Sequence, residues 1–393
     1  MDRLMYNLWL SLAVGSRRGV LLLHHFNSTE NVYAASENMF RGINGITSED
    51  IKKLSNKSVT QAETVLEVCK RESIDILDYE NSLYPQLLCN IYDFPIVLYI
   101  RGKLPPQTAP YIAIVGTRDM TPYGKVVASR LSESLSRCGY VVVSGMATGI
   151  DSEAHIGALK ADGKTVAVLG CGVDVVYPKE NRELMKYIAS SGAVISEYPP
   201  GTKPKSANFP ERNRIMSGLC LGTVVVEAGR RSGALISASC ALEQGRDVFA
   251  IPGSIANPKS EGTNSLLKDG AKPVTCVKDI LEEYEFQFPY DDKIENPDRL
   301  LTADSTFSKA VNYKKMSQTV YEEIDIHSRK EKPAPKLTQS ESAVYSVVSR
   351  GIEELDAIIN ESGLKAQEAT AVLTMLEIGG HVTSLPGKRY KLK

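Results

Sequence analysis

The chain has 393 residues, with 46 basic and 47 acidic side chains and a formal net charge of −1. This length exceeds what one ordinary hydrophobic core supports and predicts about two to four domains. The charge balance excludes binding to nucleic acid through an overall basic surface, so any such contact has to come from a local patch.

Cysteine use and hydropathy indicate a cytoplasmic protein. The seven cysteines include no C-x-x-C pair, which favours reduced thiols over disulfides or a zinc site. The apolar run at residues 8–14 is too short to span a bilayer, and Arg17 and Arg18 follow it directly. We therefore expect a soluble cytoplasmic protein that makes no use of a membrane.

Residues 1–80 show helical patterns joined by polar turns and predict a small helical (SAM/HhH-like) domain. Residues 42–46 form a glycine-containing turn, and residues 47–50 read as the capped start of the next helix. Such a turn can bind a DNA backbone through its amides. The near-neutral charge of this region favours a packing module instead.

The segment 81–109 predicts a connection that ends in one strand at residues 97–100. Between residues 110 and 285, Val/Ile-rich strand candidates recur at intervals of about 25 to 30 residues, each followed by a turn and a helix-length pattern. This α/β alternation predicts a Rossmann-like, mainly parallel sheet with flanking helices. The strand candidates begin near Tyr111, Tyr140, Thr165, Ala193, Gly222, Asp247 and Pro273.

The last part of the chain changes character. Residues 286–337 are rich in charge and poor in large aliphatic side chains, and predict a linker. Residues 338–393 then predict a C-terminal winged helix, with helices at 340–349, 352–362 and 364–378 and a short hairpin after them.

The winged helix carries an unusual charge for a duplex-binding module. Its three helices hold more acidic than basic side chains, and only the wing, with Lys388, Arg389 and Lys391, is basic. An acidic recognition helix would be repelled by DNA phosphates. We therefore favour a contact with protein, or a weak accessory contact with DNA.

Four glycine-rich turns follow directly on strand candidates of the central domain, at residues 114–118, 144–151, 169–174 and 226–233. Turns at the carboxyl ends of parallel strands present free backbone N–H groups at one edge of the sheet and favour phosphate ligands. No turn matches the dinucleotide-binding pattern or the P-loop, and no H-E-x-x-H occurs. The sequence thus predicts a phosphate-bearing ligand, with no nicotinamide cofactor and no metal site.

Cations cluster in the segments that follow these strands. Arg118, Lys179, Arg212 and Arg214 are the principal ones, and Lys203 and Lys205 lie in the same region. Guanidinium and ammonium groups both suit phosphate oxygens.

Asn213 lies between Arg212 and Arg214, and its side-chain amide can donate to a phosphate or to a base edge. The rings of Phe209 and Tyr177 could stack on an unpaired base. Arg230 and Arg231 could either bind the phosphate-bearing ligand or form internal salt bridges.

Acidic side chains in the same region leave alternatives open. Asp151, Asp174, Glu197 and Glu227 could pair internally with some of the cations. Three of them, Asp151, Asp174 and Glu227, also admit an acid/base role beside a phosphate. Capping of helices or fixing of loops is the favoured interpretation. His155 is the lone histidine of the central domain, and a structural helix position is favoured over a base.

With these motifs in order, the chain resembles the DNA-processing protein A family (DprA, also called Smf) over essentially its whole length. The shared words lie at residues 115–118, 144–151, 167–174, 177–178, 181, 196–199, 209–218, 226–228, 232–235, 248–253 and 262–264. Each of these short motifs alone is weak evidence for the family, but their order and spacing together are very specific to it.

The resemblance implies a homodimeric recombination mediator without a cofactor or enzymatic activity. It would bind single-stranded DNA (ssDNA) in a basic pocket and help to load RecA recombinase during natural transformation of competent cells, with single-strand binding protein as a further partner. The family's pocket residues correspond here to Gly116, Thr117, Arg118, Ser144, Gly145, Lys179, Phe209, Arg212, Asn213 and Arg214.

Two other functions stay open at this stage. A nucleotide or nucleoside-monophosphate hydrolase on a related Rossmann-like fold would use an acid such as Glu227, although the P-G-G-x-G-T-x-x-E word of those enzymes is absent. A scaffold or transcription factor would use the winged helix alone, and residues 1–285 would then bind no DNA.

Overall fold

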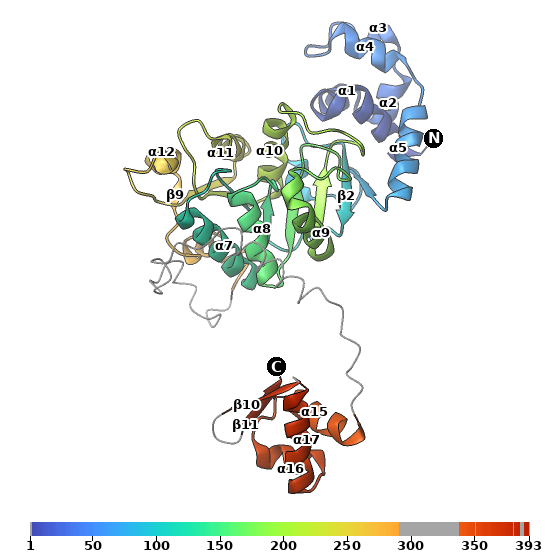
Figure 1. Ribbon diagram of the computed structural model, residues 1–393. Coiled ribbons are helices and arrows are strands. Elements are labelled where there is room, and N and C mark those ends of the chain that lie inside the picture. Colours follow the sequence, from blue (N-terminus) through green and yellow to red (C-terminus); the bar gives the residue numbers. More distant parts are fainter. Residues whose placement is uncertain (1, 291–337, 350, 380, 386–388, 393) are drawn as a thin grey trace. The chain divides into compact units, whose positions relative to one another are not determined.

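The computed structural model describes residues 2–290, 338–349, 351–379, 381–385 and 389–392 (Figure 1). The chain divides into two compact units, Met1–Ile324 and Asp325–Lys393. Most of the predicted linker, from residue 291 to 337, lies outside the described residues. In the described ranges, no helix has the length and apolar character needed to cross a membrane.

The first unit begins with a helical segment that packs onto the sheet. Its helices are α1 (Arg3–Phe26), α2 (Thr29–Ala34), α3 (Glu37–Phe40), α4 (Ser48–Ser55) and α5 (Thr60–Arg71). The predicted helix start is confirmed, because Thr47 and Asp50 form a reciprocal capping box on α4. Leu10 and Leu22 of α1 share one buried core with Tyr99 of the sheet.

A nine-stranded sheet forms the centre of the part of this unit that the structure describes. Its order is β1-β2-β6-β5-β4-β3-β7-β8-β9, parallel from β6 to β9 and antiparallel at β1 and β2. The strands are β1 (Asp75–Asp78), β2 (Val97–Gly102), β3 (Tyr111–Val115), β4 (Val141–Ser144), β5 (Thr165–Val168), β6 (Ala193–Ser196), β7 (Gly222–Val225), β8 (Asp247–Ala250) and β9 (Lys272–Pro273). The predicted mainly parallel sheet is confirmed.

One strand was not expected. Residues 75–78 lie in the region predicted to be helical, yet they form β1 and pair with β2 in antiparallel register, Asp75 opposite Ile100. A four-residue strand is too short to produce a clear alternation of its own. Pairing with β2 supplies the backbone hydrogen bonds that decide its structure.

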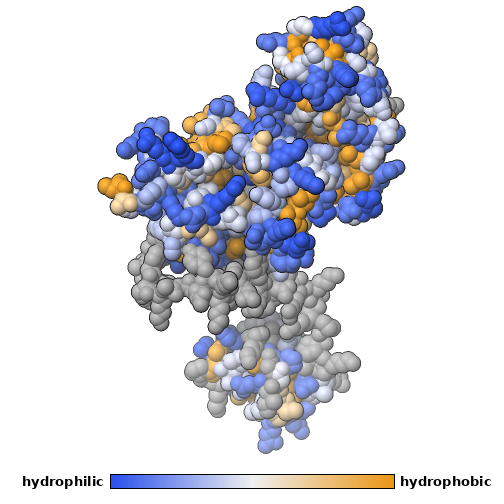
Figure 2. All heavy atoms as spheres, turned by 45° about the horizontal axis from the view of Figure 1, so that its top comes forward, coloured by the Kyte–Doolittle hydropathy of each residue, from blue (hydrophilic) through white to orange (hydrophobic). Residues whose placement is uncertain are grey.

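Helices cover both faces of the sheet (Figure 1). One face packs against α6 (Gln86–Cys89), α10 (Asn208–Leu219) and α11 (Gly233–Glu243). The other packs against α7 (Pro122–Arg137), α8 (Ile150–Lys160), α9 (Arg182–Ser191) and α13 (Lys278–Tyr284). The described part of this unit also contains the helices η1 (Lys179–Asn181), η2 (Pro258–Ser260) and α12 (Glu261–Lys268). The face seen in Figure 2 is mostly hydrophilic, with small separate hydrophobic patches.

The chain reverses direction across the sheet between β3 and β7. From β3 it proceeds through α7 to β4, on one side, whereas from β7 it proceeds through α11 to β8, on the other. The two connections leave a gap at the carboxyl ends of β3 and β7. This is the topological switch point, where open α/β sheets bind their ligands.

The second unit is a winged helix, as predicted. It contains α15 (Gln339–Ser349), α16 (Leu355–Ser362), α17 (Ala366–Ile378) and the antiparallel hairpin of β10 (Val382–Leu385) and β11 (Arg389–Leu392). Val344, Ile358 and Leu373 form its buried core. Two acidic side chains of α17 are held within the unit, because Glu368 accepts from Ser340 and Glu377 accepts from Ser384.

Candidate functional site

A cleft with a volume of about 560 Å³ opens at the switch point, and we call it the switch-point cleft. Its walls include the end of β3 with the segment after it (residues 115–119), the start of α10 and the start of α11. A smaller cavity of about 60 Å³, the ring pocket, adjoins it. The two cavities share Arg118, Ala147, Tyr177, Phe209 and Arg212.

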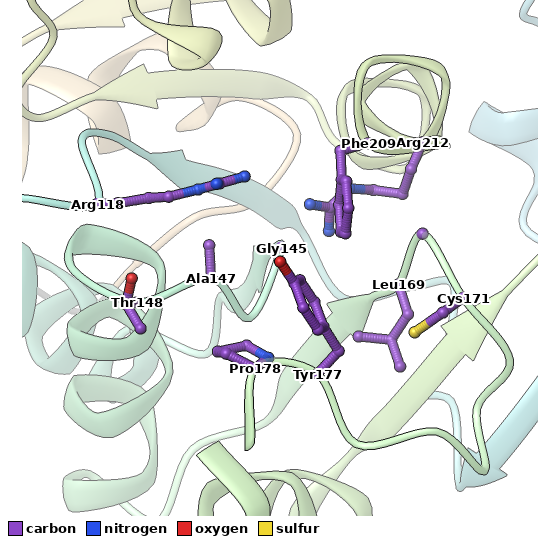
Figure 3. A pocket seen from close by; sticks show the side chains of 11 residues that line it. Arg118, Gly145, Ala147, Thr148, Leu169, Cys171, Tyr177, Pro178, Phe209 and Arg212 are labelled. Atoms are coloured by element: carbon purple, nitrogen blue, oxygen red, sulfur yellow. The ribbon is translucent and has the colours of Figure 1, made fainter. Parts of the chain in front are cut away.

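Arg118, Phe209 and Tyr177 form a stack at the boundary of the two cavities (Figure 3). The guanidinium carbon of Arg118 lies 5.9 Å from the centre of the Phe209 ring. The Phe209 and Tyr177 ring centres are 5.4 Å apart, with 34° between their planes. Arg118 is exposed and makes no ion pair with a described residue, so its charge is accessible to a ligand. The Tyr177 ring is exposed, whereas the Phe209 ring between Arg118 and Tyr177 is half-buried.

Arg212 lines both cavities and is only 4% exposed. Its guanidinium donates to the carbonyl oxygen of Val168 at the end of β5, while Nε has no hydrogen-bond partner among the described residues. Burial lowers the pKa of Arg212 to about 10, which leaves it charged at neutral pH. A Cβ atom at Gly145 would collide with this guanidinium, so only glycine leaves room for it there.

Asp151 is a buried acid whose charge interacts with that of Arg212. Burial raises the pKa of the Asp151 carboxyl, and the charge of Arg212 opposes that rise. The carboxylate also accepts from the backbone N–H of Ala147 at 3.4 Å and so holds the turn between β4 and α8. Asp151 therefore stabilises the wall of the cavities.

Three helices begin at the cavities. Ala147 and Thr148 precede the start of α8, Phe209 is in the first turn of α10, and Ser232 caps α11. The first N–H groups of a helix carry a partial positive charge and lack partners within the helix. Together with Arg118 they make this edge of the sheet a place for anions.

The structure brings together most of the binding residues predicted from the sequence. The switch-point cleft is lined by Gly116, Thr117, Arg118, Phe209, Arg212 and Asn213, and Gly145 lines the ring pocket. The remaining three residues, Ser144, Lys179 and Arg214, line neither cavity.

Arg214 is turned away from the cleft. Its Nη2 lies 2.5 Å from Glu197 Oε2, and its Nε lies 3.4 Å from Asp93 Oδ2. Side chains two positions apart on a helix point about 200° from each other, so Arg212 and Arg214 cannot both face one groove. Arg214 thus lines neither cavity with Arg118 and Arg212, and its contact with DNA stays a prediction.

Ser144 and Lys179 lie next to cavity residues without lining the cavities. Ser144 is buried, and its hydroxyl donates to the carbonyl oxygen of Ile114 at 2.6 Å, which ties β4 to β3. Lys179 is exposed in η1, directly after the cavity residue Pro178. Its contact with DNA stays a prediction.

Ile236 and Ser237 line the cleft but were not identified from the sequence, whereas Ser232 and Gly233 belong to the turn at residues 226–233 that was expected to favour phosphate. The start of α11, with Ser232, Gly233, Ile236 and Ser237, forms one wall of the cleft. The sequence signal was present, because a strand, a glycine turn and a serine cap precede this helix.

The remaining acids of the region fix loops. Glu227 accepts from the Thr121 backbone N–H at 2.9 Å and from the Thr121 hydroxyl, at the start of α7. Asp174 accepts from the Gly201 backbone N–H at 2.9 Å. These contacts agree with the favoured structural interpretation of both carboxylates.

His155 is also structural. It is fully buried, and its Nδ1 lies 2.7 Å from the Thr165 hydroxyl oxygen. Burial, and then the charge of Arg212, lowers the pKa of His155 to about 3, so the ring is neutral at physiological pH. Across the described ranges, no group of three or more His, Cys, Asp and Glu side chains is arranged to hold a metal ion.

Comparison with known proteins gives matches over both units. A family model described as DNA recombination-mediator protein A matches residues 75–285, and one described as the DprA winged helix domain matches residues 328–388. The DNA processing protein DprA of Streptococcus pneumoniae is 46% identical over 217 residues, which are 55% of this chain and 76% of that protein. Protein Smf of Synechocystis is 32% identical over 396 residues, with 98% of each chain covered.

A solved structure supports the same comparison. The X-ray structure of DNA processing protein A from Streptococcus pneumoniae superposes with a TM-score of 0.60 at 36% identity. The similarity covers 71% of this chain and 96% of that one.

Proposed function

The chain belongs to the DNA recombination-mediator protein A family, and from this premise we propose that it binds ssDNA in the switch-point cleft and the ring pocket and acts there as a recombination mediator rather than as an enzyme. The observation that carries the proposal is the stack of exposed Arg118 on the Phe209 ring, at a cleft where three helices begin.

The site offers separate groups for the phosphates and for the bases of a single strand. A positive charge and helix N-termini stabilise backbone phosphates. The exposed ring of Tyr177 and the half-buried ring of Phe209 suit stacking on a base whatever its identity, a mode available only where bases are unpaired. Buried Arg212 adds a charge that stays in place because its surroundings are packed.

One such site holds few nucleotides, so strong binding requires more than one. We propose that two copies of the chain form a homodimer and engage one strand together, because the second contact then benefits from a high effective concentration. The strand held between the sites would keep bases accessible for the nucleation of RecA on DNA covered by single-strand binding protein. Natural transformation is the process in which we expect this activity.

The winged helix is proposed to contact protein. Its acidic side chains would be repelled by the phosphates of a duplex, and the exposed face of α17 includes the uncharged Thr374 and Met375. Deletion of residues 338–393 is therefore expected to leave the affinity for oligo(dT) within about twofold.

The proposal is tested with Arg118→Ala, using fluorescence anisotropy on oligo(dT) at several salt concentrations. Loss of one phosphate contact lowers the salt slope for a single strand by about 0.7. Arg137→Ala is the matched control, because Arg137 is an exposed arginine on α7 that, among the residues the structure describes, pairs with Glu133 alone. The same variants are then compared in an assay of RecA filament nucleation. An unchanged slope and affinity in Arg118→Ala would place the DNA elsewhere.

A further inference from the structure

Asn181 is a buried side chain with no role in the site described so far. It follows Tyr177 and Pro178 in the chain, is only 5% exposed and lines neither cavity. It directly precedes α9, a position where asparagine usually caps the helix by accepting from its first N–H groups. The side chain of Asn181 makes no such bond to α9. Its amide is directed to another part of the protein instead.

The Asn181 amide donates to the turn between β4 and α8 (residues 145–149, the β4–α8 turn) and to the first turn of α8. Its Nδ2 lies 2.8 Å from the Met146 carbonyl oxygen and 2.8 Å from the Ser152 hydroxyl oxygen. The Ser152 hydroxyl in turn donates to the Ala147 carbonyl oxygen at 2.7 Å. One buried amide thus fixes two successive carbonyl groups of the turn, one directly and one through Ser152.

The β4–α8 turn depends on such contacts because its backbone is unusual. Met146 is fully buried and has a φ of 56°, in the left-handed region that residues other than glycine rarely adopt. Conformations of this kind persist where the surrounding structure determines them. Three residues of the turn, Gly145, Ala147 and Thr148, line the ring pocket. The contacts of Asn181 therefore set the position of one wall of that pocket.

The same turn also touches the segment that carries Arg118. The Ile150 N–H donates to the Thr117 carbonyl oxygen at 3.2 Å. A Cβ atom at Gly149 would overlap the carbonyl oxygens of Thr117 and Arg118, so the two backbones are in direct contact there. The β4–α8 turn thus contacts the Arg118 segment on one side and the Asn181 amide on another.

Through this turn, Asn181 connects the two outer members of the aromatic stack. Tyr177 lies just before η1, which ends with Asn181, and Arg118 lies across the β4–α8 turn from it (Figure 3). The Arg118 segment has a further anchor, because the Thr117 N–H donates to the Glu227 carbonyl oxygen at 2.8 Å. Loss of the Asn181 amide should therefore loosen the Tyr177 side of the stack more than the Arg118 side.

We propose that Asn181 is a positioning residue for base stacking: its amide fixes the Tyr177 segment to the β4–α8 turn and so keeps the Tyr177 ring at stacking distance from Phe209. This inference rests on the proposed function and adds to it a residue that touches no part of the strand. Asn181 then supports the binding of bases, whereas Arg118 supports the binding of phosphates.

The test uses Asn181→Asp, which keeps the shape of the side chain and removes the amide donor. A carboxylate directly before α9 is favourable at the helix N-terminus, so the fold is expected to persist. Asn264→Asp is the matched control, because the Asn264 amide donates to the Gly253 carbonyl oxygen at 3.1 Å and Asn264 lines neither cavity. Thermal melting of both variants identifies a temperature at which binding is compared in the folded state.

Affinity is measured for oligo(dT) and for an abasic strand of the same length, at several salt concentrations. We expect Asn181→Asp to weaken oligo(dT) binding by about tenfold, which is within the range for one stacked base. Its affinity for the abasic strand should stay within about twofold of the unchanged protein, because no base is present to stack. The salt slope should not change, since no phosphate contact is lost. Asn264→Asp should match the unchanged protein on both strands.

A second measurement separates positioning from a general loss of stability. Tyr177→Ala removes the ring, so adding Asn181→Asp to that variant should weaken oligo(dT) binding no further. A role of Asn181 in stability alone would give the same additional loss with and without the ring.

The outcomes also distinguish this inference from the proposed function. If Arg118→Ala lowers the salt slope and Asn181→Asp binds oligo(dT) like the unchanged protein, the role of Asn181 is wrong and the function stands. Equal losses on the abasic strand, or additive losses with Tyr177→Ala, overturn that role as well. So does a Tyr177→Ala variant that binds oligo(dT) normally. If the unchanged protein binds no oligo(dT), the proposed function itself fails.

Discussion

Arg212 and Arg214 lie two positions apart on α10, yet Arg212 lines the switch-point cleft while Arg214 is bound to Glu197 and Asp93 on the other side of the helix. The first arginine serves the cavity and the second fastens α10 to the segments that carry Glu197 and Asp93. This division predicts that the two positions respond differently to substitution.

Arg214→Ala is expected to destabilise the protein, because it leaves Glu197, whose side chain is 8% exposed, as a buried charge without its partner. Breaking such a pair costs about 3–5 kcal/mol of unfolding free energy. Chemical denaturation measures this loss. The fraction that remains folded should bind oligo(dT) within about twofold of the unchanged protein. A specific loss of DNA affinity at full stability would contradict the placement of Arg214 outside the cleft.

Phe209→Leu is expected to weaken the binding of oligo(dT) by removing the ring on which a base stacks. Stacking on an aromatic side chain contributes about 1–3 kcal/mol per base. An abasic strand of the same length has no base to stack, so its affinity should change little. Equal losses on both strands would show that Phe209 acts by packing alone.

Gly145→Ala is expected to displace the guanidinium of Arg212, because the added Cβ atom would overlap it. Both ssDNA affinity and thermal stability should fall. Gly233→Ala is the matched control, since the same methyl group there enters open space. Comparable behaviour of the two variants would mean that the position of Arg212 does not depend on Gly145.

The protein should lose stability as the pH falls from 7 to 5, in part through His155. Its folded pKa of about 3 lies below the ordinary histidine pKa of 6.5 because the ring is buried and Arg212 is near, so the unfolded chain binds the proton first. This difference corresponds to about 2 kcal/mol at pH 5. His155→Gln removes the titrating group, and its unfolding free energy should change less over the same range. Parallel pH curves for the two proteins would argue against a buried neutral His155.

Glu227→Gln is expected to lower the melting temperature, because the carboxylate of Glu227 holds the start of α7 through Thr121. Loss of hydrogen bonds to a charged group costs about 1.5–3 kcal/mol. Incubation of the unchanged protein with nucleoside monophosphates should release no base. Release that is abolished by Glu227→Gln would instead favour the nucleotide hydrolase.

The amino-acid sequence by itself determined the sheet and the position of the site along the chain. Strand starts such as Tyr111 and Thr165, and turns such as the one at Gly116, depend on local periodicity and on backbone freedom, which neighbouring residues express directly. The short strand Asp75–Asp78 could not be recognised in this way, because its structure depends on a partner more than 15 residues away.

The tertiary structure alone decided which charges remain available to a ligand. Arg118 has no ion-pair partner among the described residues, whereas Arg214 meets Asp93, which is 121 residues earlier in the chain. Such pairs form only when the sheet brings distant segments together. The same reason explains why the start of α11 faces Phe209: the chain reverses direction between β3 and β7, and only the folded sheet places their carboxyl ends side by side.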